Sequence, residues 1–410
     1  MSMSIPVNDP RPRRILQVDA DAFYVQVARL LDPEGAGRAE LVLVGGSPTG
    51  RGVVTSASYG CRQFGVTSGM PTARALRLCP EAMVVGVSRK EVARRSRAIV
   101  DVLQTFTPVV EPASVDEMYL DLTGTEGLYR EPFEATARRL RTAIKDATDI
   151  LVSVGGATNR FVAKLAAGRA KPHKSPEADG VLIVPPGEES AFVATLRLAD
   201  LPGVGPKFEE RLARYGMMTV PDALRHDART LTLWFGEHAG AWLWHRIRGQ
   251  DASGVRHHEV ARSLSRDETF FKDLDGERDL LRQLQRLSDR AAHDLRQSGW
   301  TARTVRVRIR DRDFKDRRKS RTLPHPVVTD QAIFAVARDL FRELRTARPV
   351  PARLLSVSLS QLRDQGEADQ TTLFPEADGG EDPRALALSK AVDRARQKFG
   401  RDAVERGGTL

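Results

Sequence analysis

The sequence predicts an α+β protein of several domains. Three observations lead to this class. The chain has 410 residues, its composition is 41% hydrophobic and 29% charged, and short strand-like runs alternate with longer helical ones. That length exceeds one ordinary domain, and the composition is typical of a globular protein. No apolar run approaches the 18 residues of a membrane span, and residues 1–14 lack the apolar core of a signal peptide.

Cysteine content and net charge narrow the class further. The two cysteines, Cys61 and Cys79, lack the partners of a zinc site, and one pair in this length does not indicate a disulfide scaffold. We therefore expect a cytoplasmic protein that does not associate with membranes. The net charge of +10 suggests a polyanionic partner, although charge alone does not identify it.

The first 180 residues predict a unit of mixed strands and helices. Strands are expected at 15–18, 41–44 and 151–155 and on either side of 114–117; helices are expected at 73–79, 135–147 and 159–170. Residues 196–247 become helical, with a tight turn at Pro202-Gly203-Val204-Gly205. A polar linker at 249–258 precedes a helix (277–297), a strand (304–310), a helix (330–345) and a strand (354–359). This order predicts a separate small α+β domain, followed by a polar tail from residue 363.

Carboxylates follow two of the expected strands. Asp19 and Asp21 come after the first strand, and Asp116 and Glu117 lie at the edge of a later one. Mg²⁺ prefers such oxygen ligands, and two ions about 4 Å apart can activate a 3′ hydroxyl and stabilise a leaving pyrophosphate. Each motif alone is ambiguous, because Asp-x-Asp also occurs in phosphatases and Asp-Glu pairs are common in solvated turns. Asp21 could instead cap the helix that follows.

Three segments, in order, resemble the motifs of Y-family translesion DNA polymerases, most closely the DNA polymerase IV group. They are Val18-Asp19-Ala20-Asp21-Ala22-Phe23-Tyr24, the segment 51–71 with Tyr59 and Arg62, and Ser114-Val115-Asp116-Glu117-Met118-Tyr119-Leu120-Asp121. The similarity extends from about residue 15 to 362. It implies a right-hand polymerase fold. Its parts would be a palm (1–22 and 88–180), fingers (23–87), a thumb with a helix-hairpin-helix (181–248), a linker (249–258), a little finger (259–362) and a tail (363–410).

The resemblance also implies a two-ion site for Mg²⁺, in which Mn²⁺ can substitute. Asp19 and Asp116 would bridge both ions, Glu117 would hold the ion at the 3′ hydroxyl, and the Ala20 carbonyl would complete the nucleotide-side ion. The nucleotide would be bound by Phe23, Tyr24, Ser56, Tyr59, Arg62 and Lys171. Among these, Tyr24 would be the steric gate that excludes a ribose 2′ hydroxyl. From the residues alone, Tyr24 could be a core aromatic and Lys171 a surface lysine.

The chain departs from the family pattern at three places. Ala28 stands where a glutamate is usual, and Gly60 stands where a larger residue is usual. Residues 173–179 intervene between Lys171-Pro172 and Gly180, where the family turns at a glycine almost at once. None of these departures removes a metal ligand. They leave open the shape of the pocket around the templating base, and therefore which lesions the protein accepts.

Two segments are expected to bind the DNA backbone. Gly203, Gly205 and Lys207 belong to the helix-hairpin-helix turn, where a helix start offers free amides to a phosphate. Arg306, Arg308 and Arg310 alternate with apolar residues on one strand, and Arg318 and Arg321 follow closely. The alternatives are a plain helix–helix turn and a solvated basic face. Contacts of this kind give affinity without sequence preference and weaken with salt.

The tail contains a candidate docking motif. Gln370, Leu373 and Phe374 resemble the motif by which bacterial polymerases bind the sliding clamp, although incidental apolar residues in a tail are the alternative. Leu388, Val392, Ala395 and Phe399 lie at helical spacing and predict an amphipathic last helix.

Together these features favour a monomeric, low-fidelity, template-directed DNA polymerase that uses primer-template DNA and dNTPs and docks on the clamp. No segment resembles a proofreading nuclease. One alternative is a catalytically weak, polymerase-like scaffold that binds DNA and clamp. It would be expected to lack one of Asp19, Asp116 and Glu117. Another is a cyclase-like nucleotidyltransferase, which would not account for the DNA-binding and clamp motifs.

Overall fold

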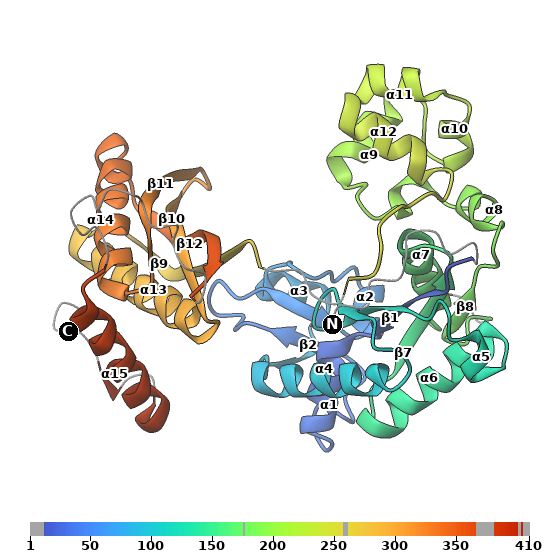
Figure 1. The fold of residues 1–410 in the computed structure, drawn as a ribbon, viewed down its shortest axis with the longest axis horizontal. Coiled ribbons are helices and arrows are strands. Elements are labelled where there is room, and N and C mark those ends of the chain that lie inside the picture. The colour runs from blue at the N-terminus through green and yellow to red at the C-terminus, as the bar shows by residue number, and fades with distance from the viewer. Residues whose placement is uncertain (1–11, 175–176, 257–260, 366–380, 401–402, 405–410) are drawn as a thin grey trace, which may run out of the picture. The chain divides into compact units, whose positions relative to one another are not determined.

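The chain forms two compact units, Met1–Glu259 and Val260–Leu410. The computed structural model describes residues 12–174, 177–256, 261–365, 381–400 and 403–404 (Figure 1). The strands and helices of both units confirm the predicted α+β class. Among the described helices, none is long and apolar enough to cross a membrane.

A five-stranded sheet forms the centre of the first unit. Its order is β5 (Val110–Pro112), β6 (Glu117–Asp121), β1 (Ile15–Ala20), β7 (Val152–Ala157) and β8 (Val181–Ile183). β1 is the middle strand and runs antiparallel to both β6 and β7. Because both faces of β1 are covered, its residues from Ile15 to Val18 are buried, including the polar Gln17.

Helices cover both faces of this sheet. On one face, Leu16 and Val18 pack with α1 (Phe23–Leu31), α4 (Arg89–Gln104) and α6 (Phe133–Thr148). On the other face, Ile15 packs with α7 (Arg160–Ala170). The short helix α5 (Glu126–Tyr129) precedes α6. Side chains therefore alternate along β1 between two cores, and Asp19 has the same parity as Ile15, on the α7 side.

Two smaller parts complete the first unit. A three-stranded sheet has the order β3 (Val54–Ala57), β2 (Val42–Gly45) and β4 (Met83–Val85), and α2 (Tyr59–Gln63) and α3 (Thr72–Leu78) pack with it. The other part is helical: α8 (Glu189–Ala194), η1 (Leu198–Asp200), α9 (Pro206–Ala213), α10 (Val220–Leu224), α11 (Ala228–Phe235) and α12 (Glu237–Arg246). Both free cysteines are buried in the smaller sheet's core.

The turn before α9 is as tight as the sequence predicts. The Val204 N–H donates to the Leu201 carbonyl at 2.9 Å. Gly203 has a φ of 107°, and a Cβ there would lie 2.7 Å from the Trp242 ring, so only glycine fits. Pro206 begins α9, a position where its missing N–H costs nothing.

The second unit is a four-stranded antiparallel sheet with helices on one face. The chain order is β9 (Ser263–Leu274), α13 (Glu277–Gln297), β10 (Trp300–Asp311), β11 (Asp316–Val327), α14 (Asp330–Ala347), β12 (Ala352–Asp364) and α15 (Pro383–Phe399). The sheet order is β11-β10-β12-β9. Val305, Val307 and Ile309 of β10 are buried with the inner sides of α13 and α14.

The structure confirms the predicted helix at 277–297 and corrects two other expectations. β9 and β11 are strands where none was predicted, and β12 continues to Asp364, into the segment predicted as tail. The predicted last helix exists as α15, and two of its apolar residues, Leu388 and Phe399, are 59% and 70% exposed. A largely polar side holds α15 instead: Asp393 accepts from Arg296 at 2.6 Å, and Ser389 donates to Asp330 at 2.6 Å.

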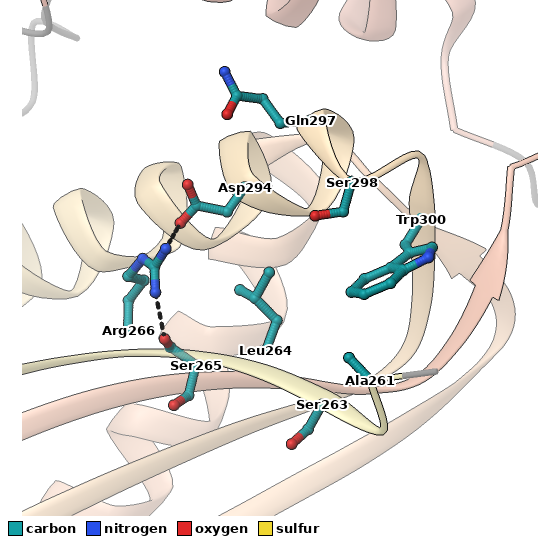
Figure 2. A pocket seen from close by; sticks show the side chains of 9 residues that line it. All are labelled: Ala261, Ser263, Leu264, Ser265, Arg266, Asp294, Gln297, Ser298 and Trp300. Carbon is teal, nitrogen blue, oxygen red and sulfur yellow. Dashed lines mark hydrogen bonds and ion pairs between the residues drawn. The ribbon is translucent and has the colours of Figure 1, made fainter. Parts of the chain in front are cut away.

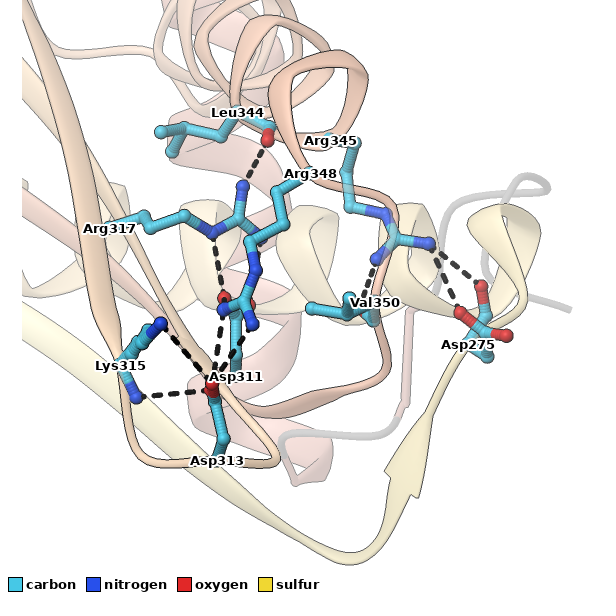
Figure 3. Close-up of polar contacts among 9 residues, drawn as sticks. All are labelled: Asp275, Asp311, Asp313, Lys315, Arg317, Leu344, Arg345, Arg348 and Val350. Atoms are coloured by element: carbon cyan, nitrogen blue, oxygen red, sulfur yellow. Dashed lines mark hydrogen bonds and ion pairs between the residues drawn. The ribbon is translucent and has the colours of Figure 1, made fainter.

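A buried carboxylate fixes the end of β10. Asp311 is fully buried and accepts two hydrogen bonds from the Arg317 guanidinium, at 2.8 and 2.9 Å (Figure 3). Arg348, which follows α14, also binds Asp311 and reaches Asp313 at 2.9 Å. A buried charge is tolerated only when it is paired and hydrogen-bonded, as here. This cluster therefore ties β10 and β11 to the end of α14.

We expect Asp311→Ala to destabilise the second unit by about 3 kcal/mol, because it leaves the Arg317 guanidinium without its buried partner. Hydrogen exchange of the β10 and β12 amides would report the loss. Asp313→Ala is the matched control: Asp313 also pairs with Arg348 but is exposed, so exchange should change little. Equal protection in both variants would contradict a structural role for Asp311.

Candidate active site

The carboxylates meet where β1 ends between β6 and β7. In the strand register, Asp19 lies opposite Glu117 on one side and opposite Ser153 on the other. The Ala20 N–H donates to the Asp116 carbonyl at 2.9 Å, which places Asp116 beside the last residue of β1. Residues about 100 positions apart in the sequence are thereby adjacent at one end of the central strand, as the sequence predicts.

A serine turn orients the second pair of carboxylates. The Ser114 hydroxyl accepts from the main-chain N–H of Asp116 at 3.2 Å and of Glu117 at 3.0 Å, and it donates to the Asp116 carboxylate. A serine that binds its own following backbone in this way stabilises a turn. Ser114 therefore sets the direction in which both carboxylates leave the strand.

Two lysines, one within α7 and one directly after it, neutralise the carboxylates. The Lys171 ammonium group donates to Asp19 Oδ1 at 2.7 Å and lies 3.8 Å from Asp21 Oδ1. The Lys164 ammonium group donates to Glu117 Oε2 at 2.5 Å. Burial raises the pKa of Asp19, and the nearby Lys171 charge opposes that rise. The sequence analysis did not single out Lys164, although its place on the helix that leads directly to Lys171 was a usable signal.

Asp21 joins the site rather than a helix cap. The Ser153 hydroxyl donates to its carboxylate at 3.0 Å, and the Tyr59 hydroxyl lies 3.4 Å from Oδ1. Burial raises the pKa of Asp21, and Lys171 and these hydroxyl groups oppose the rise. The N-cap of α1 is Ala22, with a φ of 46° and no side-chain cap. The alternative that Asp21 caps α1 is therefore wrong.

The predicted nucleotide residues divide into two groups. The first surrounds α2: the Arg62 guanidinium lies 4.8 Å from the Tyr59 ring centre, and Ser56 is buried on β3 just before them. The second group begins α1: Tyr24 is half-buried, while the Phe23 side chain is buried in the core with Val18. A role for Phe23 at a nucleotide would therefore rest on its main chain.

The donor set suits a hard cation, but the present side-chain arrangement does not assemble one site. Among the described residues, no group of three or more His, Cys, Asp and Glu side chains is close enough to hold a metal ion. The two lysine ammonium groups already compensate Asp19 and Glu117. Asp19, Asp116 and Glu117 nevertheless supply only oxygen ligands from adjacent backbone positions, the chemistry that Mg²⁺ prefers. The residues therefore fit such ions once the lysines move aside.

In the second unit, the predicted arginines lie on two different faces of the sheet. Arg306, Arg308 and Arg310 share the face opposite the helices, and Arg318 lies directly across from Arg308. Some of them are already paired: Arg308 binds Asp267 at 3.0 Å, and Arg310 binds Asp316 at 2.7 Å.

Arg321 lies elsewhere. It is across from the inward-facing Val305 and binds Glu343 of α14 at 3.2 Å. It therefore lies on the helix-covered side of the sheet, away from the other four arginines.

Gly205 and Lys207 are exposed at the start of α9, as expected for the turn. A hollow near the start of β9 is lined by residues that include Arg266, Asp294 and Trp300 (Figure 2). Its acidic group, Asp294, is paired with Arg266, so the hollow offers no second carboxylate site. Gln370, Leu373 and Phe374 lie outside the described residues.

Three family profiles match the chain. Residues 18–168 match the impB/mucB/samB family, residues 261–373 match its C-terminal domain, and residues 199–251 match the thumb domain of DNA polymerase-iota.

Curated relatives match almost the whole length. A DNA polymerase IV of Dehalococcoides mccartyi is 35% identical over 397 residues, covering 97% of each chain. One of Caulobacter vibrioides is also 35% identical, covering 97% of this chain and 94% of its own. One of Halorhodospira halophila is 36% identical over 351 residues, covering 86% of this chain and 96% of its own.

Solved structures match the fold. A Y-family DNA polymerase chimera has a TM-score of 0.77 at 24% identity, covering 86% of this chain and 99% of its own. The DinB structure from Sulfolobus solfataricus has a TM-score of 0.59 at 25% identity, covering 85% of this chain and 98% of its own. A post-insertion binary complex of Dbh DNA polymerase has a TM-score of 0.61 at 25% identity, covering 86% and 99%.

We expect Gly155→Ala to destabilise the first unit by about 1–3 kcal/mol, as overpacking does. A Cβ at Gly155 would lie 2.0 Å from the Ala167 nitrogen and 2.2 Å from the Ala163 carbonyl oxygen, and would push α7 off the sheet. Chemical denaturation would measure the loss. Gly168→Ala, on the same helix with open space around its Cβ, is the control and should be neutral or stabilising. Equal stability of the two variants would contradict the close packing of α7.

Proposed function

The chain belongs to the DNA polymerase IV family of translesion Y-family polymerases, and on that premise we propose that its carboxylate cluster catalyses template-directed dNTP addition. The observation that carries the proposal is the strand register, which places Asp19 opposite Glu117 with Asp116 beside Ala20. A catalytically weak scaffold would not need this arrangement. Low fidelity and bypass of damaged bases follow from the family.

We assign the oxygen ligands of the two-ion site to Asp19, Asp116, Glu117 and the Ala20 carbonyl. Two Mg²⁺ ions, or Mn²⁺ in their place, would lower the pKa of the primer 3′ hydroxyl and neutralise the pyrophosphate leaving group. The fold of the chain holds these oxygen ligands in position. β1 and β6 fix the carboxylates, and Ser114 fixes the turn that precedes Glu117. A displacement of about 1 Å at such a site would slow the reaction strongly.

Lys171, Arg62, Tyr59 and Ser56 form the proposed triphosphate site. The charge that develops on the leaving group is stabilised by cationic groups held in advance. Lys171 lies 2.7 Å from Asp19, so on this proposal it exchanges a carboxylate for a phosphate when the nucleotide binds.

The DNA would be bound by two surfaces, one in each unit. In the first unit, Gly203, Gly205 and Lys207 present main-chain N–H groups and an exposed ammonium group to a phosphate. In the second, the outer face of β10 and β11 presents Arg306, Arg308, Arg310 and Arg318. We leave Arg321 out of this strip because α14 engages it. Binding through these residues should weaken steeply with salt.

We propose the same domain division as the sequence suggests. Residues 1–22 and 88–180 would be the palm, 23–87 the fingers, 181–248 the thumb, 249–258 the linker, 259–362 the little finger and 363–410 the tail, except that the little finger would extend to Asp364, where β12 ends. Gln370, Leu373 and Phe374 would dock on the sliding clamp, which would supply processivity to a monomeric enzyme.

We expect primer extension on undamaged template to fall about 10³-fold or more in Asp116→Ala/Glu117→Ala, since several kcal/mol of transition-state stabilisation are lost. Extension would be followed with Mg²⁺ and each dNTP. Asp101→Ala, which removes an exposed carboxylate on α4, should behave as wild type. A folded wild-type chain that binds DNA without extending it would instead favour the scaffold function.

Tyr24→Ala should admit ribonucleotides. If the ring fills the space of the 2′ hydroxyl, removing it lowers the penalty against a ribonucleotide by about 1–3 kcal/mol, or about 5- to 160-fold in discrimination. The ratio of kcat/KM for dNTP and rNTP measures this. Tyr24→Phe keeps the ring and should keep the discrimination. Unchanged discrimination in Tyr24→Ala would remove the steric-gate assignment.

A further inference from the structure

A short turn follows α7. It contains Lys171-Pro172-His173-Lys174 and begins the segment that departs from the family pattern. The Lys174 N–H donates to the Lys171 carbonyl at 2.9 Å, which closes a four-residue turn. Pro172 occupies the second position, where its fixed φ favours such turns. Lys171 and His173 therefore project from one short, constrained piece of backbone.

The two side chains of this turn reach different parts of the first unit. Lys171 binds Asp19 at the end of β1. The His173 imidazole stacks on the Tyr59 ring of α2, with ring centres 3.7 Å apart and planes inclined by 23°. The Tyr59 hydroxyl in turn lies 3.4 Å from Asp21 Oδ1. The turn thus connects the five-stranded sheet to the smaller sheet's helix at the point where the proposed triphosphate ligands meet.

We propose that His173 is a positioning residue of the triphosphate site, whose ring holds Tyr59 so that Tyr59, Arg62 and Lys171 face the incoming dNTP together. This inference rests on the proposed function. Without the stack, Tyr59 would be held by the long hydrogen bond to Asp21 and by the Arg62 guanidinium against its ring. Arg62 also donates from Nε to the Ala57 carbonyl at 3.0 Å, so a displaced Tyr59 removes one of the two contacts that hold its guanidinium.

The charges around His173 favour a packing role. Burial against its neighbours and the positive charges of Lys174, Lys171 and Arg62 lower the pKa of His173 to about 4. The imidazole is therefore neutral at neutral pH and does not compete with Lys171 and Arg62 for phosphate. Any flat ring of similar size should therefore substitute for the imidazole. The residue contributes a packing surface at this position and no positive charge.

The test compares His173→Ala with His173→Phe. A stacked aromatic pair is worth about 0.5–1.5 kcal/mol beyond its buried area, so His173→Ala should raise KM for dNTP by about two- to tenfold. We expect kcat to stay within about twofold, because the carboxylates are untouched. His173→Phe should restore KM. An unchanged KM in His173→Ala, or a KM in His173→Phe as high as in His173→Ala, would overturn the proposal.

A second measurement separates this inference from the proposed function. Binding of the next correct dNTP to a complex of the chain with a dideoxy-terminated primer–template reports the nucleotide site without chemistry. Wild type should bind, and His173→Ala should bind about two- to tenfold more weakly, with DNA affinity unchanged. Equal dNTP binding by both proteins would overturn the role of His173 and leave the polymerase assignment intact. Failure of wild type to bind or extend would overturn both.

The partner of the stack provides a final control. His173→Ala should cost nothing further in a Tyr59→Ala background if the two rings act as a pair, because contacting residues are not additive. Additive losses would show that His173 acts without Tyr59 and would overturn the proposal.

Lys174→Ala, in the same turn, removes a charge without touching the stack. It should leave dNTP binding near the wild-type value, and a loss equal to that of His173→Ala would identify a charge effect instead.

Discussion

The ion pairs made by Lys164 with Glu117 and by Lys171 with Asp19 are the interactions on which the site depends. Carboxylates on neighbouring strands repel each other, and burial penalises their charged forms. Lys164 lies on α7 and Lys171 follows its last residue, so the position of this helix decides whether the cluster is compensated. That position depends on Gly155, where even a single added carbon would meet the helix backbone. A sterically small strand residue thus supports the electrostatics of the site.

Much of this site could be predicted because it is built from local signals. A mostly apolar run that stops at Asp19 marks the end of β1, and antiparallel pairing sets that end beside Glu117, where β6 begins. Motif order then identified Asp116 and Glu117. The stack of His173 on Tyr59 could not be predicted, because it depends on a turn that the family pattern does not contain and on a partner more than 100 residues away.

In the second unit, too, some of the strands could not be predicted from the sequence. β10 alternates apolar and basic residues and was recognised, whereas β9 and β11 have mostly exposed side chains and no clear alternation. β11 and β9 are strands because they pair with β10 and β12. The pattern of apolar and polar residues within β9 and β11 does not indicate that pairing. For α15, the apolar spacing predicted a helix, but the polar contacts of Asp393 and Ser389 determine which side packs.

The ion pairs that basic residues already make within the chain also constrain how polyanions can bind. Arg308 and Arg310 are partly exposed and paired with carboxylates, and pairs of this kind contribute little to stability, so a phosphate can replace the carboxylate at low cost. Lys171 is different, because its pair with Asp19 is largely shielded from water. It can turn to a phosphate only if Asp19 finds another cation, since an unpaired buried carboxylate is costly. On the proposed function, nucleotide binding and occupation of the carboxylate site by cations are therefore coupled through one lysine, whereas backbone binding by the arginine strip needs no such exchange.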